Sequence, residues 1–182
     1  KLDYLSSQEE ELVDYLACFR APASVSLLAR LLGLSMEEVV EITEEFGQKQ
    51  LLMEEEQGEE LVVRFSQELL RIYAYERLPL AKKRMLHHQI AQGMEDQLGD
   101  SLYHAQLLNE IAYHYKMSKQ LIKSLEYELH YLEATLQFHH ELFPIYSREF
   151  GFIEKTDDSN QSAVLDQFDR IRREIEGLER KH

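Results

Sequence analysis

The stretch that decides the fold reads Leu51-Leu52-Met53-Glu54-Glu55-Glu56-Gln57-Gly58-Glu59-Glu60-Leu61-Val62-Val63-Arg64-Phe65. Two short apolar runs, at 51–53 and 61–65, lie on either side of an acidic turn that contains Gly58. Short apolar runs that flank a polar, glycine-containing turn are typical of two paired β-strands. The stretch therefore predicts a β-hairpin that ends near Phe65.

Three amphipathic helices are expected ahead of this hairpin. The first begins at Ser6 or Ser7, with Glu10 at capping-box spacing from Ser7. A short second helix follows the break at 21–23, and the third begins at Ser35, which opens a capping box of its own. Three helices followed by a hairpin form the layout of a winged helix.

Beyond the hairpin the spacing of apolar residues is helical almost throughout. We expect a mostly α fold, in which a winged helix with a small β-hairpin precedes a tetratricopeptide-like helical array. The expected divisions are a winged-helix-like domain (1–65), connecting helices with a basic cluster (66–98) and the tetratricopeptide-like region (99–182). The expected helices cover about 66–78, 80–98, 102–117 and 120–140, with an interruption near Pro144 and a last helix after a loop at 156–160.

Composition excludes several classes of protein. The 182 residues carry 34 acidic and 20 basic side chains, a net charge of −14, and 44% of them are hydrophobic, which is enough for a packed core. A single cysteine, Cys18, excludes a disulfide framework and a cysteine-rich zinc site. No apolar run approaches the roughly 18 residues of a membrane span, and no stretch has the pattern of a signal-peptide h-region. Because the sequence begins Lys1-Leu2, we expect an internal piece of a larger cytoplasmic protein.

The charge is concentrated in the predicted winged helix. Residues 1–62 contain fifteen acidic and four basic residues, a net charge of −11. A winged helix that reads DNA places its third helix in the major groove and clamps phosphates with basic side chains. Here that helix carries five glutamates, and Lys49 at its far end is its only basic residue. We therefore expect no direct contact with nucleic acid. The acidic face is either a solvated surface or a surface for a protein partner or a neighbouring domain.

Two stretches beyond the hairpin carry a specific pattern. They contain Phe65-Ser66-Gln67-Glu68-Leu69-Leu70-Arg71, Tyr75-Glu76-Arg77-Leu78, Ala81-Lys82-Lys83-Arg84, Leu86-His87, Ile90-Ala91, Met94-Glu95, Ile111-Ala112-Tyr113-His114-Tyr115 and Lys123-Ser124-Leu125-Glu126-Tyr127. The first stretch, residues 65–95, resembles without a gap a segment of the signal-transduction ATPases with numerous domains, which are large bacterial regulators. The second resembles the start of that family's tetratricopeptide-like repeats. Gln67 stands where the family has a histidine, and Ser124 stands where a small alanine usually packs.

The resemblance implies a noncatalytic module for regulation and protein interaction, which belongs to a larger bacterial signalling protein that regulates transcription. In such proteins the helical part senses a partner or inducer and holds an ATPase, located elsewhere in the chain, in check. The phosphate loop Gly-x-x-x-x-Gly-Lys-[Ser/Thr] is missing from this sequence, as is any nucleophile with a base and an orienting carboxylate. We expect no enzyme activity and no cofactor. The alternative function is a DNA-binding winged-helix transcription factor.

Two groups of side chains are candidates for partner contacts. The first is basic and could meet the acidic winged helix within the chain, dock a partner or contact nucleic acid; it comprises Arg71, Arg77, Lys82, Lys83 and Arg84. The second is aromatic and could form either core packing or a recognition groove for a peptide or small ligand; it comprises Tyr103, Tyr113, Tyr115, Tyr127 and Tyr131.

The eight histidines have no spacing suited to a metal ion. The adjacent pairs 87–88 and 139–140 point about 100° apart on a helix, so neither pair chelates one ion easily. We expect no metal site, and we expect His87 and His114 to be buried, hydrogen-bonded rings at helix-packing positions.

Overall fold

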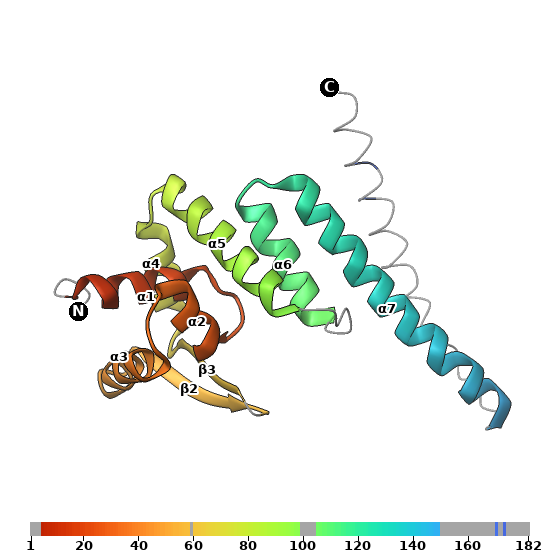
Figure 1. The fold of residues 1–182 in the computed structure, drawn as a ribbon, viewed down its shortest axis with the longest axis horizontal. Coiled ribbons are helices and arrows are strands. Elements are labelled where there is room, and N and C mark those ends of the chain that lie inside the picture. The colour runs from red at the N-terminus through yellow and green to blue at the C-terminus, as the bar shows by residue number, and fades with distance from the viewer. Residues whose placement is uncertain (1–4, 59, 99–104, 150–169, 171–172, 174–182) are drawn as a thin grey trace.

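The computed structural model describes residues 5–58, 60–98 and 105–149, together with residues 170 and 173 (Figure 1). The chain is mostly α-helical, with one small antiparallel sheet, as predicted. Within the described residues no helix is both long and apolar enough to cross a membrane. The elements are α1 (Ser7–Cys18), β1 (Ala23–Ser24), α2 (Val25–Leu32), α3 (Met36–Gln48), β2 (Leu52–Gln57), β3 (Glu60–Phe65), α4 (Glu68–Arg77), α5 (Leu80–Leu98), α6 (Ala105–Met117) and α7 (Leu121–Glu149).

The first six elements have the order helix, strand, helix, helix, strand, strand, which is that of a winged helix. Strands β2 and β3 form the predicted hairpin, in register from Leu52 opposite Phe65 to Gln57 opposite Glu60. Gly58 lies in its turn with φ of 66°, a conformation that glycine adopts without strain. The sequence did not reveal β1, which pairs with β3 and places β3 at the centre of the sheet.

Capping boxes fix the starts of two helices. Ser35 begins α3 as predicted: its hydroxyl accepts a hydrogen bond from the backbone N–H of Glu38, whose carboxylate accepts one from the Ser35 N–H. For α1 the predicted pair Ser7–Glu10 is wrong by one residue, because Ser6 caps the helix and Glu9 completes the box. Both pairs have the same spacing, so the sequence alone did not separate them.

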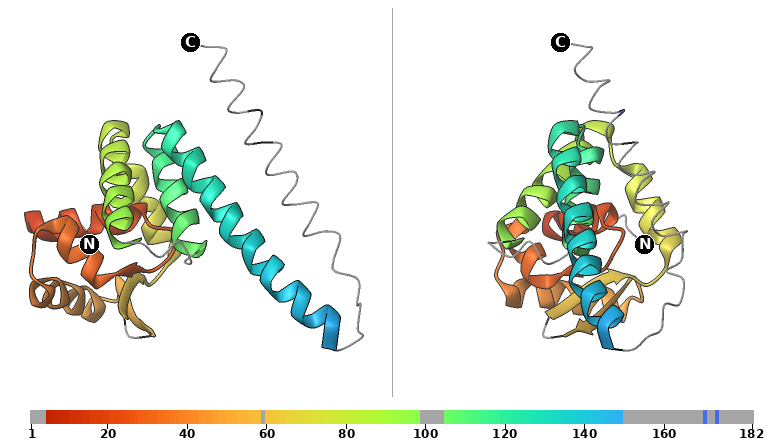
Figure 2. Two further views of the ribbon diagram at one scale, coloured as in Figure 1. Left: turned by 45° about the vertical axis from the view of Figure 1, so that its right-hand side comes forward. Right: turned by 90° about the vertical axis from the view of Figure 1, so that its right-hand side faces the viewer.

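Pro144 does not interrupt the helix in which it lies. Helix α7 continues through it to Glu149, so both the expected interruption and the expected end near residue 140 are wrong. Proline removes one helical hydrogen bond and crowds one carbonyl, which a long helix can accommodate. The expected loop at 156–160 and most of the expected last helix lie outside the described residues. Helix α7 extends well beyond the other elements (Figure 2).

One buried core runs through both halves of the molecule. It extends from Leu12 of α1 through the winged helix to Ile90 of α5, Ile111 of α6 and Tyr127 of α7. Helix α5 contacts α1 and α2 on one side and α6 on the other, and α6 packs against α7 (Figure 1). The expected boundaries at residues 65 and 98 therefore fall within a continuous core. Ser124, where an alanine was expected, packs between α6 and α7 and donates a hydrogen bond to the Ala112 carbonyl at 2.9 Å.

Gly93 allows α5 to approach α2 closely. A Cβ atom at this position would lie 3.0 Å from Leu27 Cδ1 and 3.2 Å from Leu31 Cδ2. The Arg30 guanidinium also donates a hydrogen bond to the Gly93 carbonyl. A larger side chain at this position would therefore crowd the Leu27 and Leu31 side chains, which would have to move to admit it.

We expect Gly93→Leu to lower the free energy of unfolding by about 1–3 kcal/mol, the range for overpacked sites. Urea denaturation measures the change. Gly47→Leu is the matched control, because no atom lies within 4 Å of a Cβ at Gly47. In the control the substitution should be neutral or stabilising, since leucine has the higher helix propensity. Equal effects at the two positions would contradict the close packing of α5 on α2.

Candidate functional site

The candidate site is the junction, by which we mean the surface where α1 and α2 meet α4, α5 and α6. Polar contacts cross it at several points in addition to the apolar core. The Tyr15 hydroxyl donates to Gln89 Oε1 at 3.0 Å, and Arg20 pairs with Glu110 at 2.9 Å. A hydrogen bond has specific geometry, so these contacts fix the winged helix in one orientation on the helices.

Two residues of the predicted basic cluster also contact α1 across the junction. Lys82 of α5 forms an ion pair of 2.5 Å with Asp14, whose side chain is only 10% exposed. Arg71 of α4 donates a hydrogen bond of 3.0 Å to the Ala17 carbonyl at the end of α1. These two cations therefore contact the acidic winged helix, which was the intramolecular alternative for the cluster.

The remaining three cations have different surroundings. Lys83 pairs with Glu76 at 3.5 Å and lies over the ring of Tyr75, so its charge is matched within the helical part. Arg77 stacks 5.8 Å above the Tyr73 ring, and Arg84 is exposed. Neither arginine forms a hydrogen bond or ion pair with a residue in the described part of the chain. The structure thus divides the cluster into two cations that cross the junction, one paired locally and two left for other contacts.

A pair of fully buried histidines lies at the centre of the junction. Nδ1 of His87 is 2.9 Å from Nδ1 of His114, and the Tyr75 hydroxyl lies 3.1 Å from Nε2 of His87. The ring of Phe19, which follows α1, packs edge-on against His114 with centroids 5.4 Å apart. The expectation that both rings are buried and hydrogen-bonded is confirmed.

The surroundings keep both imidazoles neutral. Burial, together with the nearby charges of Arg20 and Lys83, lowers the pKa of His87 to about 4. Burial and the neighbouring His87 lower the pKa of His114 well below its ordinary value. A short contact between two Nδ1 atoms has room for one proton only, so one ring donates and the other accepts. Protonation of the accepting Nδ1 atom would remove this hydrogen bond.

Two of the predicted tyrosines are part of the helix packing. Tyr115 and Tyr127 are buried, their rings stack with centroids 5.7 Å apart, and both hydroxyls donate to the carboxylate of Glu95 on α5. Lys123 of α7 pairs with the same carboxylate at 3.1 Å. This cluster ties α5, α6 and α7 together, which favours the core-packing alternative over a recognition groove for these residues.

The other tyrosines are dispersed. Tyr113 lies in the junction, where the Arg20 guanidinium stacks 3.5 Å above its ring. Tyr131 is partly buried against the core, and Tyr103 lies outside the described residues. The four described tyrosines are therefore not brought to one shared open surface.

Sequence reasoning missed two carboxylates, one that anchors the junction and one that joins α5 to α6 and α7. Asp14 interrupts the buried face of α1, where its neighbours Leu12, Val13 and Leu16 are apolar. A charged residue within an apolar stripe signals a partner, because a buried charge is costly unless it is paired. Glu95 gives the same signal, because this charged residue directly follows the buried Met94 in α5.

The outer face of α3 is as acidic as the sequence predicts. All five of its glutamates are exposed, namely Glu37, Glu38, Glu41, Glu44 and Glu45. Lys49, the only base of the segment, lies 3.7 Å from Glu9 and 3.5 Å from Glu45. No cation of α3 is therefore left for a phosphate. Among the described residues, no three histidine, cysteine or acidic side chains gather in a way that would hold a metal ion.

Comparison with known proteins adds no relative. No model of a known protein family matches the chain, and no curated protein has a detectably similar sequence.

The histidine pair predicts a specific dependence of stability on pH. An unfolded histidine has a pKa near 6.5, whereas His87 has a pKa of about 4 in the folded chain. The unfolded state therefore binds more protons between these values, and stability falls as the pH drops from about 6.5 toward 4. Each histidine contributes a slope of about 1.4 kcal/mol per pH unit in this range.

We expect the double variant His87→Gln with His114→Leu to show a flatter dependence of unfolding free energy on pH between 4 and 6.5. Glutamine retains a partner for Tyr75, and leucine suits the apolar surroundings of His114. Urea denaturation at a series of pH values measures the slope. His130→Gln, a change at a partly exposed histidine, is the control. The same slope in all three proteins would contradict neutral burial of the pair.

Proposed function

We propose that this chain is a noncatalytic regulatory and protein-interaction module of a larger cytoplasmic bacterial regulator of transcription. Binding of a partner or inducer to the helical part is transmitted through the junction to the winged helix, and from there to an ATPase or effector outside this chain. The observation that carries the proposal is the continuous core, which makes α5 a shared element of both halves.

The junction has the features of a coupling surface. A ligand shifts a conformational equilibrium only if it binds the two states with different affinity. Contacts such as Lys82–Asp14 and Arg71–Ala17 exist only while α4 and α5 are docked on α1. A partner that binds α4 or α5 more tightly in one docking state therefore shifts the docking equilibrium of the winged helix.

The resemblance to the signal-transduction ATPases supports this proposal. Its most specific stretch, residues 65–95, covers the end of β3, all of α4 and most of α5. Arg71 and Lys82 within this stretch contact α1 across the junction. The residues that carry the resemblance are thus those that hold the two halves together.

The acidic face of α3 supports a protein contact rather than a DNA contact. The topology alone favours the alternative, a winged-helix transcription factor that reads DNA through its third helix. Each phosphate near α3 would meet exposed carboxylates instead of cations, which raises the free energy of binding. A basic surface on a neighbouring domain or partner matches this face better.

The reading frame that encodes this chain gives the most direct test. We expect it to encode a phosphate loop upstream and a helix-turn-helix effector elsewhere in the same protein. Sequencing the complete gene decides this. A start codon at this point, with neither segment present, would refute the proposal.

A DNA-binding assay tests the alternative. We expect the purified chain to cause no salt-dependent shift of a labelled duplex even at about 10–100 μM, where nonspecific DNA-binding proteins bind because their Kd values are about 10⁻⁴–10⁻⁶ M. Specific DNA-binding proteins would already cause a shift at submicromolar concentration. The variant Glu37→Gln with Glu41→Gln and Glu44→Gln controls for the charge of the α3 face. A shift with the unmodified chain that disappears at high salt would favour the DNA-binding alternative.

In the complete regulator, we expect Asp14→Asn to raise basal ATP hydrolysis several-fold. The substitution leaves the Lys82 ammonium without its carboxylate partner and weakens the docking of α5 on α1. Glu11→Gln, on the exposed side of the same helix, is the matched control. Unchanged hydrolysis in both variants would contradict coupling through the junction.

A further inference from the structure

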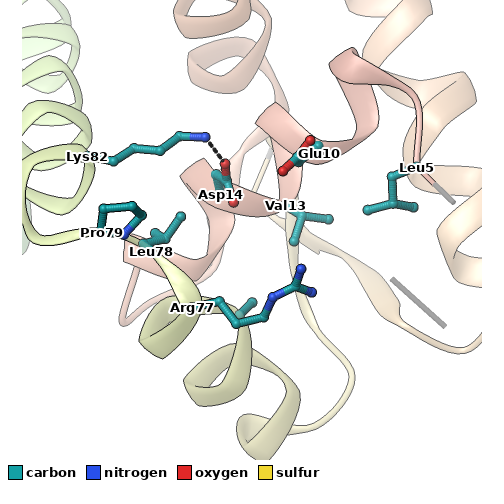
Figure 3. A pocket seen from close by; sticks show the side chains of 9 residues that line it. Leu5, Glu10, Val13, Asp14, Arg77, Leu78, Pro79 and Lys82 are labelled. Carbon is teal, nitrogen blue, oxygen red and sulfur yellow. Dashed lines mark ion pairs between the residues drawn. The ribbon is translucent and has the colours of Figure 1, made fainter. Parts of the chain in front are cut away.

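A small cavity lies in the junction on the opposite side of α1 from the acidic α3 face. One wall is formed by α1 and the other by the end of α4 and the start of α5 (Figure 3). Its volume is about 110 Å³. Pockets for drug-sized ligands measure about 300–1,000 Å³, so this cavity suits a molecule with only a few non-hydrogen atoms.

The charges that line the cavity are balanced and divided between its two walls. Glu10 and Asp14 belong to α1, and Arg77 and Lys82 belong to α4 and α5. A simple anion would meet two carboxylates, and a simple cation would meet two basic groups, so each would be repelled by half of the charges. A small molecule that carries both charges fits both walls.

Among the described residues, Glu10 and Arg77 are the two charged side chains of the cavity without a hydrogen bond or ion pair, and both are exposed. Asp14 and Lys82 pair with each other at 2.5 Å. The hydrogen bond to Asp14 and, to a lesser extent, the charge of Glu10 raise the pKa of the Lys82 ammonium. Figure 3 shows the Glu10 carboxylate and the Arg77 guanidinium on opposite sides of the Val13 side chain.

The rest of the lining is apolar. Val13, Ala74 and Leu78 are 6%, 4% and 7% exposed, so they form a buried floor below the charged rim. An aliphatic group placed on this floor would lose its contact with water, which favours binding.

We propose that this cavity binds a small free amino acid in its zwitterionic form. Its carboxylate contacts the Arg77 guanidinium, a geometry that guanidinium groups favour, and its ammonium contacts the Glu10 carboxylate. Because the ligand touches α1 and α4 at once, it stabilises the docked junction by mass action. The amino acid would be the inducer of the proposed regulator, and only this role rests on the proposed function.

The test is a titration of the ¹⁵N-labelled chain, followed by amide chemical shifts. The probes are glycine, L-alanine and β-alanine, with acetate and methylammonium as ions of a single charge. We expect saturable shifts at residues 10–14 and 77–82 with at least one zwitterion, and none with the single ions. Because these ligands have few non-hydrogen atoms, we expect a Kd on the order of a millimolar.

Charge-removing variants separate this site from a general surface effect. Arg77→Gln and Glu10→Gln should each weaken binding about tenfold or more, since each removes a charge-assisted hydrogen bond. Arg84→Gln on α5 and Glu11→Gln on α1 are the matched controls, because they make the same changes at exposed positions outside the cavity. All four positions are exposed, so the fold should persist, which circular dichroism verifies.

Three results would overturn the proposal: no saturable shift with any zwitterion, equal shifts with acetate, or equal weakening by Arg77→Gln and Arg84→Gln. The titration uses the chain itself and requires neither an ATPase nor a DNA target. Its failure is therefore distinguishable from failure of the proposed regulatory function, which the reading frame and the hydrolysis assay decide.

Discussion

The packing of α5 between the two halves of the molecule is the constraint on which the rest of the structure depends. Its buried residues contact α1 and α2 of the winged helix as well as α6 of the helical hairpin. Gly93 brings α5 close to α2, and His87 on the same helix contacts His114 of α6. A single helix thus packs in both halves of the continuous core. Neither half can move without changing contacts in the other.

The polar groups of the junction give this packing a defined orientation. Apolar contacts are not directional, whereas the Lys82–Asp14 ion pair and the hydrogen bond from Arg71 to the Ala17 carbonyl each require one arrangement. Breaking either contact leaves a buried polar group without its partner, which is costly. The junction therefore holds the two halves in one defined arrangement.

The sequence predicted the elements better than their contacts. The hairpin at 51–65 and the Ser35 cap follow from local patterns, and both are present. Strand β1 has two residues, too short to show alternation, and Pro144 is tolerated because α7 is long. The basic cluster was recognised from composition, but its partner Asp14 was not, since only the packing of α5 on α1 brings the two together. The cavity beside Arg77 arises from the same packing and has no local signal.

Native-state hydrogen exchange tests the central claim that the two halves form one cooperative unit. Ile111→Ala removes a fully buried side chain from α6, outside the winged helix, and should cost about 2–5 kcal/mol. If α5 couples the halves, the amides of α2 and α3 should lose as much protection as those of α6. Loss confined to α5, α6 and α7, with unchanged exchange at Leu28 and Phe46, would show that the winged helix is independent and would contradict this account.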